Sequence, residues 1–141
     1  MTKYLIIIPS FNRRDDLRET IRSMKFLQEN VGFELVVVDD CSTDGTAEML
    51  QDKFPWIKLL QNDPQLGPAA SRNRAANEFE AEFYIFLDSD IEVPQDWSEK
   101  IQELASPRKV IAGKIVNLYD KEVEVGPRRA TFIGGSISCK P

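Results

Sequence analysis

The sequence predicts an α/β fold in which an open, mostly parallel sheet is flanked by helices. Short apolar runs alternate along the chain with segments whose apolar residues recur at helical spacing, and this alternation is typical of parallel βαβ units. Three of the runs end in polar residues, at Pro9–Asn12, Asp39–Asp40 and Asp88–Asp90. Because ligands of such sheets bind beyond the carboxyl ends of the strands, these residues predict a site at one edge of the sheet.

The expected elements follow one another without a repeat, a linker or a low-complexity segment. Pro9 should end the first strand, Asp15 or Asp16 should cap the first helix, and Pro68 suits the first turn of a later helix. We expect strands at 4–8, 35–38, 57–60, 83–87, 110–116 and 130–139 (around Gly134–Gly135), helices at about 15–27, 46–54, 68–78 and 93–104, and a charged turn at 121–129.

Phe83–Leu87 is a run of five apolar residues, which predicts a strand buried on both faces. Asp88 and Asp90 follow it, and residues i and i+2 of an extended segment point the same way. Two carboxylates held together repel each other, and a cation offsets that cost. The alternative is an ordinary polar loop after a strand, since Asp and Ser favour turns.

Composition and charge narrow the classes of function. With 141 residues, 42% hydrophobic and 29% charged, we expect one soluble domain over 1–141. The net charge of -5 argues against a nucleic-acid partner. The chain has no histidine, which excludes Ser-His-Asp and Cys-His catalysis and leaves a metal site of oxygen ligands, hence Mg, Mn or Ca.

The sequence shows no leader and no apolar run that could cross a bilayer. Cys41 and Cys139 lie far apart, which fits a reduced compartment better than a disulfide framework. We therefore expect a cytoplasmic protein, working in the cytoplasm or at the inner face of the membrane.

Four motifs, taken together in their order and spacing, resemble glycosyltransferase family 2, whose members have the GT-A fold. They are Ile6–Arg13, similar to the family's opening strand and turn; Val36–Thr46, similar to its Val-Asp-Asp-Gly-Ser-x-Asp-Gly-Thr signature; Gly67 with Ser71–Asn73, similar to its Gly…Ala-Arg-Asn helix; and Phe86–Asp90, similar to its DxD motif. The resemblance implies a Rossmann-like sheet. It also implies sugar transfer from a nucleotide diphosphate sugar, UDP-linked by preference, with inversion and with Mn or Mg as cofactor.

The resemblance also implies a role for each residue of the expected site. An uracil N3–H would suit an acceptor-only carboxylate such as Asp39. The implied nucleotide-sugar residues are Pro9 and Phe11 (base pocket), Asn12, Asp39 (base), Gly67, Arg72 (base or phosphates), and Asp88 and Ser89 (ribose); the implied metal ligands are Asp90 and Asp88.

The chain departs from the family pattern in several places. Phe11 stands where members usually have Tyr, Cys41 stands in place of a glycine, and Asp40 could simply cap the following helix. An inverting transferase needs a general base, and no acid follows Gly135. We therefore expect residues 1–100 to form the donor-binding core and 101–141 to begin an incomplete acceptor-side segment.

The general base should then lie beyond Pro141, and the chain alone should be inactive. The acceptor would be a cell-surface saccharide or a lipid-linked sugar. One alternative is a nucleotide-sugar-binding module without turnover. A second is a phosphatase of the haloacid dehalogenase type, whose strand also ends in DxD but at the start of its domain, and which leaves Asp39–Asp40 unexplained.

Overall fold

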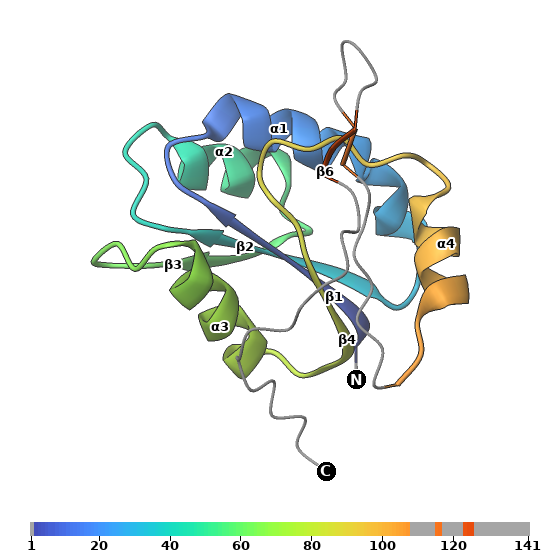
Figure 1. Ribbon diagram of the computed structural model, residues 1–141. Helices are drawn as coiled ribbons and strands as arrows, with labels where there is room; N and C mark the ends of the chain where they lie inside the picture. Colours follow the sequence, from blue (N-terminus) through green and yellow to red (C-terminus); the bar gives the residue numbers. More distant parts are fainter. Residues whose placement is uncertain (1, 108–114, 117–122, 126–141) are drawn as a thin grey trace. The chain divides into compact units, whose positions relative to one another are not determined.

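The computed structural model describes residues 2–107, 115–116 and 123–125, drawn in colour in Figure 1. The chain divides into two units, Met1–Glu103 and Leu104–Pro141. In the first unit, four parallel strands form a sheet in the order β3-β2-β1-β4. In the second, β5 (Ile115–Val116) pairs antiparallel with β6 (Val123–Val125).

The first unit confirms the predicted alternation of strands and helices. The strand order reverses at β1, because the chain leaves β3 and returns on the other side of β1 to form β4. Its elements are β1 (Thr2–Ser10), α1 (Arg14–Ser23), the 3-10 helix η1 (Lys25–Glu29), β2 (Phe33–Asp39), α2 (Thr46–Lys53), β3 (Lys58–Gln61), α3 (Pro68–Glu78), β4 (Ala81–Phe86) and α4 (Trp97–Leu104).

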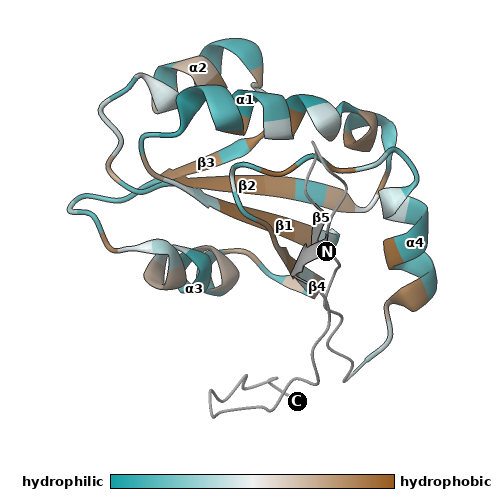
Figure 2. Ribbon diagram, turned by 45° about the horizontal axis from the view of Figure 1, so that its top comes forward, coloured by the Kyte–Doolittle hydropathy of each residue, from teal (hydrophilic) through white to brown (hydrophobic). Residues whose placement is uncertain are grey.

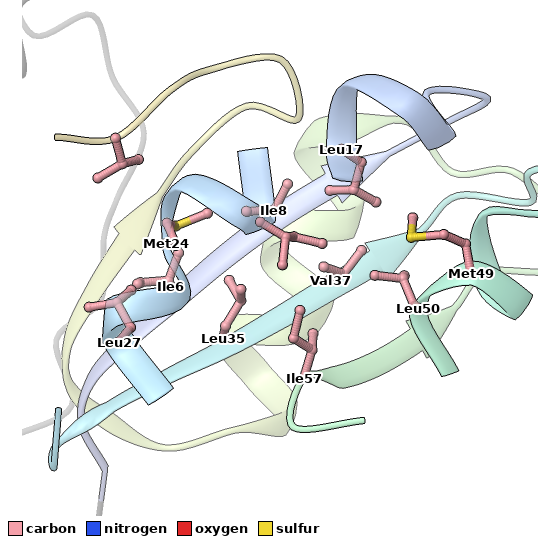
Figure 3. Close-up of a cluster of buried hydrophobic side chains, with 12 residues drawn as sticks. Ile6, Ile8, Leu17, Met24, Leu27, Leu35, Val37, Met49, Leu50 and Ile57 are labelled. Atoms are coloured by element: carbon pink, nitrogen blue, oxygen red, sulfur yellow. The ribbon is translucent and has the colours of Figure 1, made fainter. Parts of the chain in front are cut away.

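The sheet is covered by α1 and α2 on one face and by α3 on the other (Figures 1 and 2). Because side chains alternate along a strand, Ile6 and Ile8 belong to the core under α1 and α2, whereas Leu5 and Ile7 pack on the side of α3. The first core is shown in Figure 3. Cover on both faces explains why β1 and β2 are continuously apolar runs without polar alternation.

The expectation that β4 is buried on both faces is wrong. Its residues alternate in exposure, and Phe86 is 50% exposed. Ile85 and Leu87 pack against the core on the side of α1. On the opposite face α3 packs over β1 and β2, which leaves Tyr84 and Phe86 of the outer strand only partly covered.

Several element boundaries also differ from the predictions. β1 continues through Pro9 to Ser10, because its ladder with β4 ends at the pair of Ile7 and Phe86 and no N–H is needed at Pro9 on that side. In the predicted turn at 121–129, Val123–Val125 is a strand. Of the strand predicted at 110–116, the structure describes Ile115–Val116, and Gly134–Gly135 lies outside the described residues. In the described ranges no helix is long and apolar enough to span a bilayer.

Candidate nucleotide-sugar site

The polar ends of β1, β2 and β4 lie at one edge of the sheet. The register pairs Ser10 with Asp39 across β1 and β2, and it pairs Ile7 with Phe86 across β1 and β4. The Leu87 N–H donates to the carbonyl of Ile7 at 3.1 Å, so the chain leaves β4 beside β1. The structure therefore brings the three predicted polar segments together where the strand order reverses.

The loops that follow β1 and β2 are tied to each other. The Asn12 N–H donates to Ser42 Oγ at 3.0 Å, and the Thr43 N–H donates to Asn12 Oδ1 at 2.8 Å. Asn12 adopts a left-handed backbone with φ of 50°, a conformation that Asn tolerates better than most residues. The Asn12 amide oxygen is thus engaged in joining the two loops.

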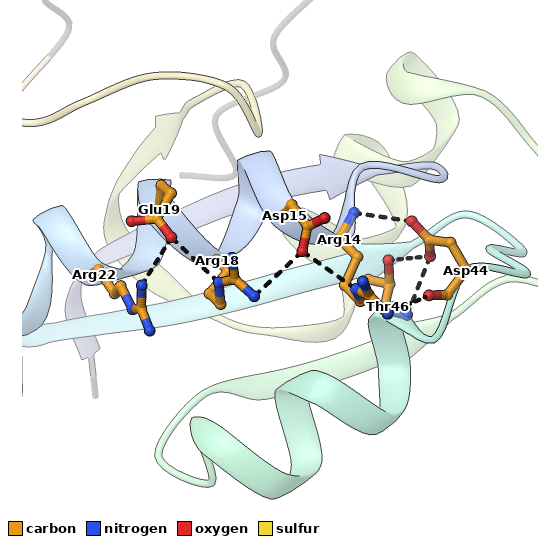
Figure 4. A network of polar contacts seen from close by, with 7 residues as sticks. All are labelled: Arg14, Asp15, Arg18, Glu19, Arg22, Asp44 and Thr46. Atoms are coloured by element: carbon orange, nitrogen blue, oxygen red, sulfur yellow. Dashed lines mark hydrogen bonds and ion pairs between the residues drawn. The ribbon is translucent and has the colours of Figure 1, made fainter.

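The expected capping of α1 by Asp15 or Asp16 is wrong. The helix begins at Arg14, so both acids lie inside its first turn, and Asp15 pairs with Arg14 and Arg18 on the outer surface (Figure 4). The first N–H of the helix donates instead to Asp44 Oδ2, from the loop after β2, at 2.9 Å.

Asp44 serves two helices at once. Its Oδ1 accepts hydrogen bonds from the N–H and hydroxyl of Thr46, at the start of α2, while its Oδ2 accepts from the N–H of Arg14 (Figure 4). Burial alone would raise the pKa of Asp44, but these hydrogen bonds outweigh it and hold the pKa below its usual value. One carboxylate therefore fixes the starts of both helices beside the site.

Asp40 is buried and holds the loop that leads into α3. Its Oδ1 accepts from Asn62 Nδ2 at 2.6 Å, from the Leu66 N–H at 2.8 Å and from Ser71 Oγ at 3.3 Å, and its Oδ2 accepts from the Gly67 N–H at 2.8 Å. Asp40 does not cap the helix that follows it, the alternative raised from the sequence, because its partners lie before and within α3. Burial would raise the pKa of Asp40, but the hydrogen bonds outweigh it and lower the pKa.

The residues predicted for the base pocket differ in exposure. Asp39 is 2% exposed and accepts the Ser42 N–H at 3.3 Å, while Phe11 presents an exposed ring. Pro9 is buried at the end of β1. Cys41, a free and exposed thiol next to Asp40, has φ of 70°, the left-handed conformation in which glycine is favoured.

The acids after β4 are exposed and face arginines. Asp88 Oδ1 accepts from Arg72 Nη2 at 2.6 Å, and Asp90 lies 3.9 Å from Arg13 Nη1. The side chains of Asp88 and Asp90 are 61% and 52% exposed. The Ser89 carbonyl accepts a hydrogen bond from the Thr20 hydroxyl at 3.0 Å.

Among the residues that the structure describes, two buried polar groups at this edge have no hydrogen-bond partner. They are the Ser10 hydroxyl, at the end of β1, and Nε of Arg72, beside Asp88. Buried polar groups in folded proteins are nearly always paired, and unpaired ones at a candidate site indicate room for a polar ligand. Within residues 2–107 and the two described strands beyond them, no three acids or thiols gather into a metal-binding group.

A divalent cation still fits this edge. Asp88 and Asp90 offer exposed oxygen ligands, and Mg²⁺ is commonly held by one or two carboxylates together with substrate phosphates instead of an all-protein cage.

The sequence did not predict most of the residues whose hydrogen bonds hold the loops of the site in place. The side chains of Thr20, Asn62 and Ser71 donate to backbone or carboxylate oxygens that are remote in sequence. Asp44 and Ser71 stand within two of the family-like motifs, Val36–Thr46 and Gly67 with Ser71–Asn73, but those motifs did not indicate their supporting hydrogen bonds. Nothing in the local pattern marks Thr20 or Asn62.

Comparison with protein families supports the resemblance seen in the motifs. The sequence model of the family described as "Glycosyl transferase family 2" matches residues 5–137. TuaG of Bacillus subtilis, a glycosyltransferase named for teichuronic acid biosynthesis, is 35% identical over 109 residues, which cover 73% of this chain and 42% of TuaG. TarS of Staphylococcus aureus, a poly(ribitol-phosphate) beta-N-acetylglucosaminyltransferase, is 35% identical over 94 residues, covering 64% of this chain and 16% of TarS.

Solved structures agree with the sequence comparison. A crystal structure of a TarS fragment in complex with UDP-GlcNAc has a TM-score of 0.63 at 26% identity, covering 84% of this chain and 41% of that one. The mannosyltransferase PcManGT from Pyrobaculum calidifontis, in complex with GDP-Man and Mn2+, has a TM-score of 0.65 at 25% identity, and the match covers 74% of this chain and 33% of PcManGT. The sheet is therefore of the GT-A type, and the chain spans less than half the length of these relatives.

Proposed function

The chain belongs to glycosyltransferase family 2, and we propose that it is the donor-binding part of an enzyme that transfers a sugar from a nucleotide diphosphate sugar, UDP-linked by preference, with inversion. The observation that carries the proposal is the meeting of three strand ends. They place an exposed aromatic ring, a buried carboxylate and two exposed acids with their arginines at one edge of the sheet.

We assign the base of the nucleotide to the loop after β1 and the end of β2. The exposed ring of Phe11 can stack on a base, and Pro9, buried near the end of β1, would line the same pocket. From the described part of the chain, the Asp39 carboxylate accepts one hydrogen bond, which leaves it acceptor capacity for an uracil N3–H. Asn12 acts here by holding the loops in place, because its amide oxygen is already bonded to Thr43.

We assign the ribose and diphosphate to the ends of α3 and β4. Arg72 Nη2 donates to Asp88, and Arg72 Nε has no partner within the described residues, so the guanidinium can exchange part of its contact with Asp88 for a phosphate. Gly67 sets the start of α3 with φ of 86°, and Asp88 and Ser89 would face the ribose.

Asp90 and Asp88 would hold Mn²⁺ or Mg²⁺ against the diphosphate, as their exposure allows. The cation would supply charge neutralisation for the departing nucleoside diphosphate. The removal of the acceptor proton needs a general base, which we place outside this donor half.

The acceptor we propose is a cell-surface saccharide or a lipid-linked sugar. TarS, by its name, acts on poly(ribitol-phosphate), so a polyol phosphate polymer belongs on the panel of acceptors to be tested. We place the reaction in the cytoplasm or at the inner face of the membrane.

Thermal unfolding with nucleotides and metals tests the proposal. We expect UDP with Mn²⁺ or Mg²⁺ to stabilise the chain more than either alone, by about 2.7 kcal/mol when the ligand is present at about 100 times its dissociation constant. GDP and TDP, with and without metal, test the preference for uracil. Equal melting temperatures in all conditions would contradict a nucleotide-sugar site.

A turnover assay separates the proposal from the binding module without turnover. UDP release and glycoside formation are followed by mass for the chain and for a form extended to the length of its relatives. Acceptor-dependent product from the extended form supports the transferase. Nucleotide binding without product in the extended form, over a panel of UDP-sugars and acceptors, would favour the binding module.

A further inference from the structure

One face of α1 presents two hydroxyls to the loop that follows β4. Thr20, which is 1% exposed, donates from Oγ1 to the Ser89 carbonyl at 3.0 Å and accepts the Ile91 N–H at 3.1 Å. One turn later, Ser23 Oγ accepts the Val93 N–H at 3.0 Å and donates to the Thr20 carbonyl at 2.7 Å. The three contacts with the loop after β4 join residues that are about seventy positions apart in the chain.

The two partners of Thr20 belong to the two peptide groups that flank Asp90. The Ser89 carbonyl is part of the peptide before Asp90, and the Ile91 N–H is part of the peptide after it. Because peptide groups are planar, the relative orientation of these two planes is set by φ and ψ of Asp90 alone. A single hydroxyl that bonds to both planes therefore fixes the backbone from which the Asp90 side chain projects.

Within the ranges that the structure describes, the Asp90 side chain is held only loosely. It is 52% exposed and lies 3.9 Å from Arg13, whereas Asp88 is held directly by Arg72 at 2.6 Å. We propose that Thr20 is a positioning residue, which holds the Asp90 carboxylate in the orientation required to bind a divalent cation together with a nucleoside diphosphate. This inference rests on the proposed function of the acids after β4.

The expected effect is on metal binding more than on nucleotide binding. Without the Thr20 hydroxyl, the loop must be ordered when the cation binds, and that ordering lowers affinity. Valine matches the shape of threonine but offers no hydrogen bond, while serine keeps the hydroxyl. Ser23→Ala is the matched control, because it removes a hydroxyl from the same helix whose partner, the Val93 N–H, does not flank Asp90.

The test is calorimetric titration of the 141-residue chain with Mn²⁺ at saturating UDP, and with UDP in the absence of metal. For Thr20→Val we expect Mn²⁺ affinity to fall about tenfold, which corresponds to roughly one lost hydrogen bond, while metal-free UDP affinity stays within about twofold. Thr20→Ser should restore most of the Mn²⁺ affinity, and Ser23→Ala should leave it unchanged.

Amide hydrogen exchange of the ligand-free chain tests independently whether the Thr20 hydroxyl holds the peptides on either side of Asp90. Thr20→Val should speed exchange at Ile91, and Ser23→Ala at Val93. Three results would overturn the positioning role. The first is a Thr20→Val variant that binds Mn²⁺ as tightly as the parent chain, and the second is one that loses as much metal-free UDP affinity as Mn²⁺ affinity. The third is a Ser23→Ala variant that loses as much Mn²⁺ affinity as Thr20→Val. If the parent chain binds no metal–UDP complex although exchange at Ile91 responds to Thr20→Val, the proposed function is wrong and the positioning role is wrong with it. The hydrogen bonds of Thr20 to the peptides on either side of Asp90 would still be supported.

Discussion

Two strands of this sheet end in a pair of acids, and the two pairs have opposite surroundings. At the end of β2, Asp39 and Asp40 are 2% and 3% exposed. At the end of β4, the side chains of Asp88 and Asp90 are 61% and 52% exposed. In the sequence both pairs look alike, because each follows a run of apolar residues.

The difference lies in which groups satisfy the carboxylates. Asp40 accepts four hydrogen bonds from protein groups, so both its oxygens are engaged by the fold. Thr20 bonds to the backbone on both sides of Asp90, and the Asp90 side chain is 52% exposed, with Arg13 3.9 Å away. A carboxylate whose hydrogen-bonding capacity is used by the protein stabilises structure, whereas one that is held but unsatisfied can bind a ligand.

The largest expected effect is the loss of stability in Asp40→Ala. The substitution leaves the Asn62 amide and the N–H groups of Leu66 and Gly67 without their acceptor in a buried position. We expect the free energy of unfolding to fall by about 3 kcal/mol, measured by urea denaturation. A loss below about 1 kcal/mol would show that Asp40 is not structural and would remove its contrast with Asp90.

Acid should weaken the contacts of Asp40. The pKa of Asp40 is lower in the folded chain than its usual value of about 3.9 in an unfolded one. The unfolded chain therefore binds the proton first, so the contribution of Asp40 to stability is complete above about pH 4 and is lost as the pH falls through the lower folded pKa. Asp44 acts in the same direction. In urea titrations, the stability difference between the parent chain and Asp40→Asn should shrink below about pH 4, and a constant difference would contradict the linkage.

Cys41→Gly should raise stability slightly. Cys41 has φ of 70° in the turn directly after Asp40, where a side chain costs about 1 kcal/mol and glycine does not. The gain is partly offset by the greater freedom of glycine in the unfolded chain, so we expect up to about 0.5 kcal/mol. Cys41→Val, which places a branched side chain in the same conformation, should destabilise the protein in the same urea assay. If both variants unfold alike, the turn is not strained.

Asp90→Ala should change stability least and ligand binding most. Asp90 is half exposed after the end of β4, so its truncation opens no cavity and relieves repulsion from Asp88. We expect the free energy of unfolding to stay within about 0.5 kcal/mol of the parent value, and the additional stabilisation by Mn²⁺ in the presence of UDP to disappear. A variant that unfolds, or that keeps metal-linked binding, would contradict the assignment of Asp90 as a metal ligand.

Much of the fold could be predicted from local pattern. Apolar runs and helical spacing depend on residues within a few positions of one another, and they located β1 to β4 and α1 to α4 to within a few residues. Pro68 marked the first residue of α3. The polar ends of the strands followed from the same reasoning, because parallel strands bring their carboxyl ends to one edge.

The sequence by itself therefore determined the alternating α/β architecture and the edge at which the acids gather. Only the tertiary structure decided what each acid does. Asp44 caps a helix 30 residues away, Asp40 holds a loop 27 residues away, and Thr20 fixes a peptide 69 residues away. The partial exposure of β4 likewise depends on where α3 packs. Periodicity along the chain reports which face a side chain takes, but hydrogen bonds between remote segments depend on how the packed elements meet, and no local spacing encodes that.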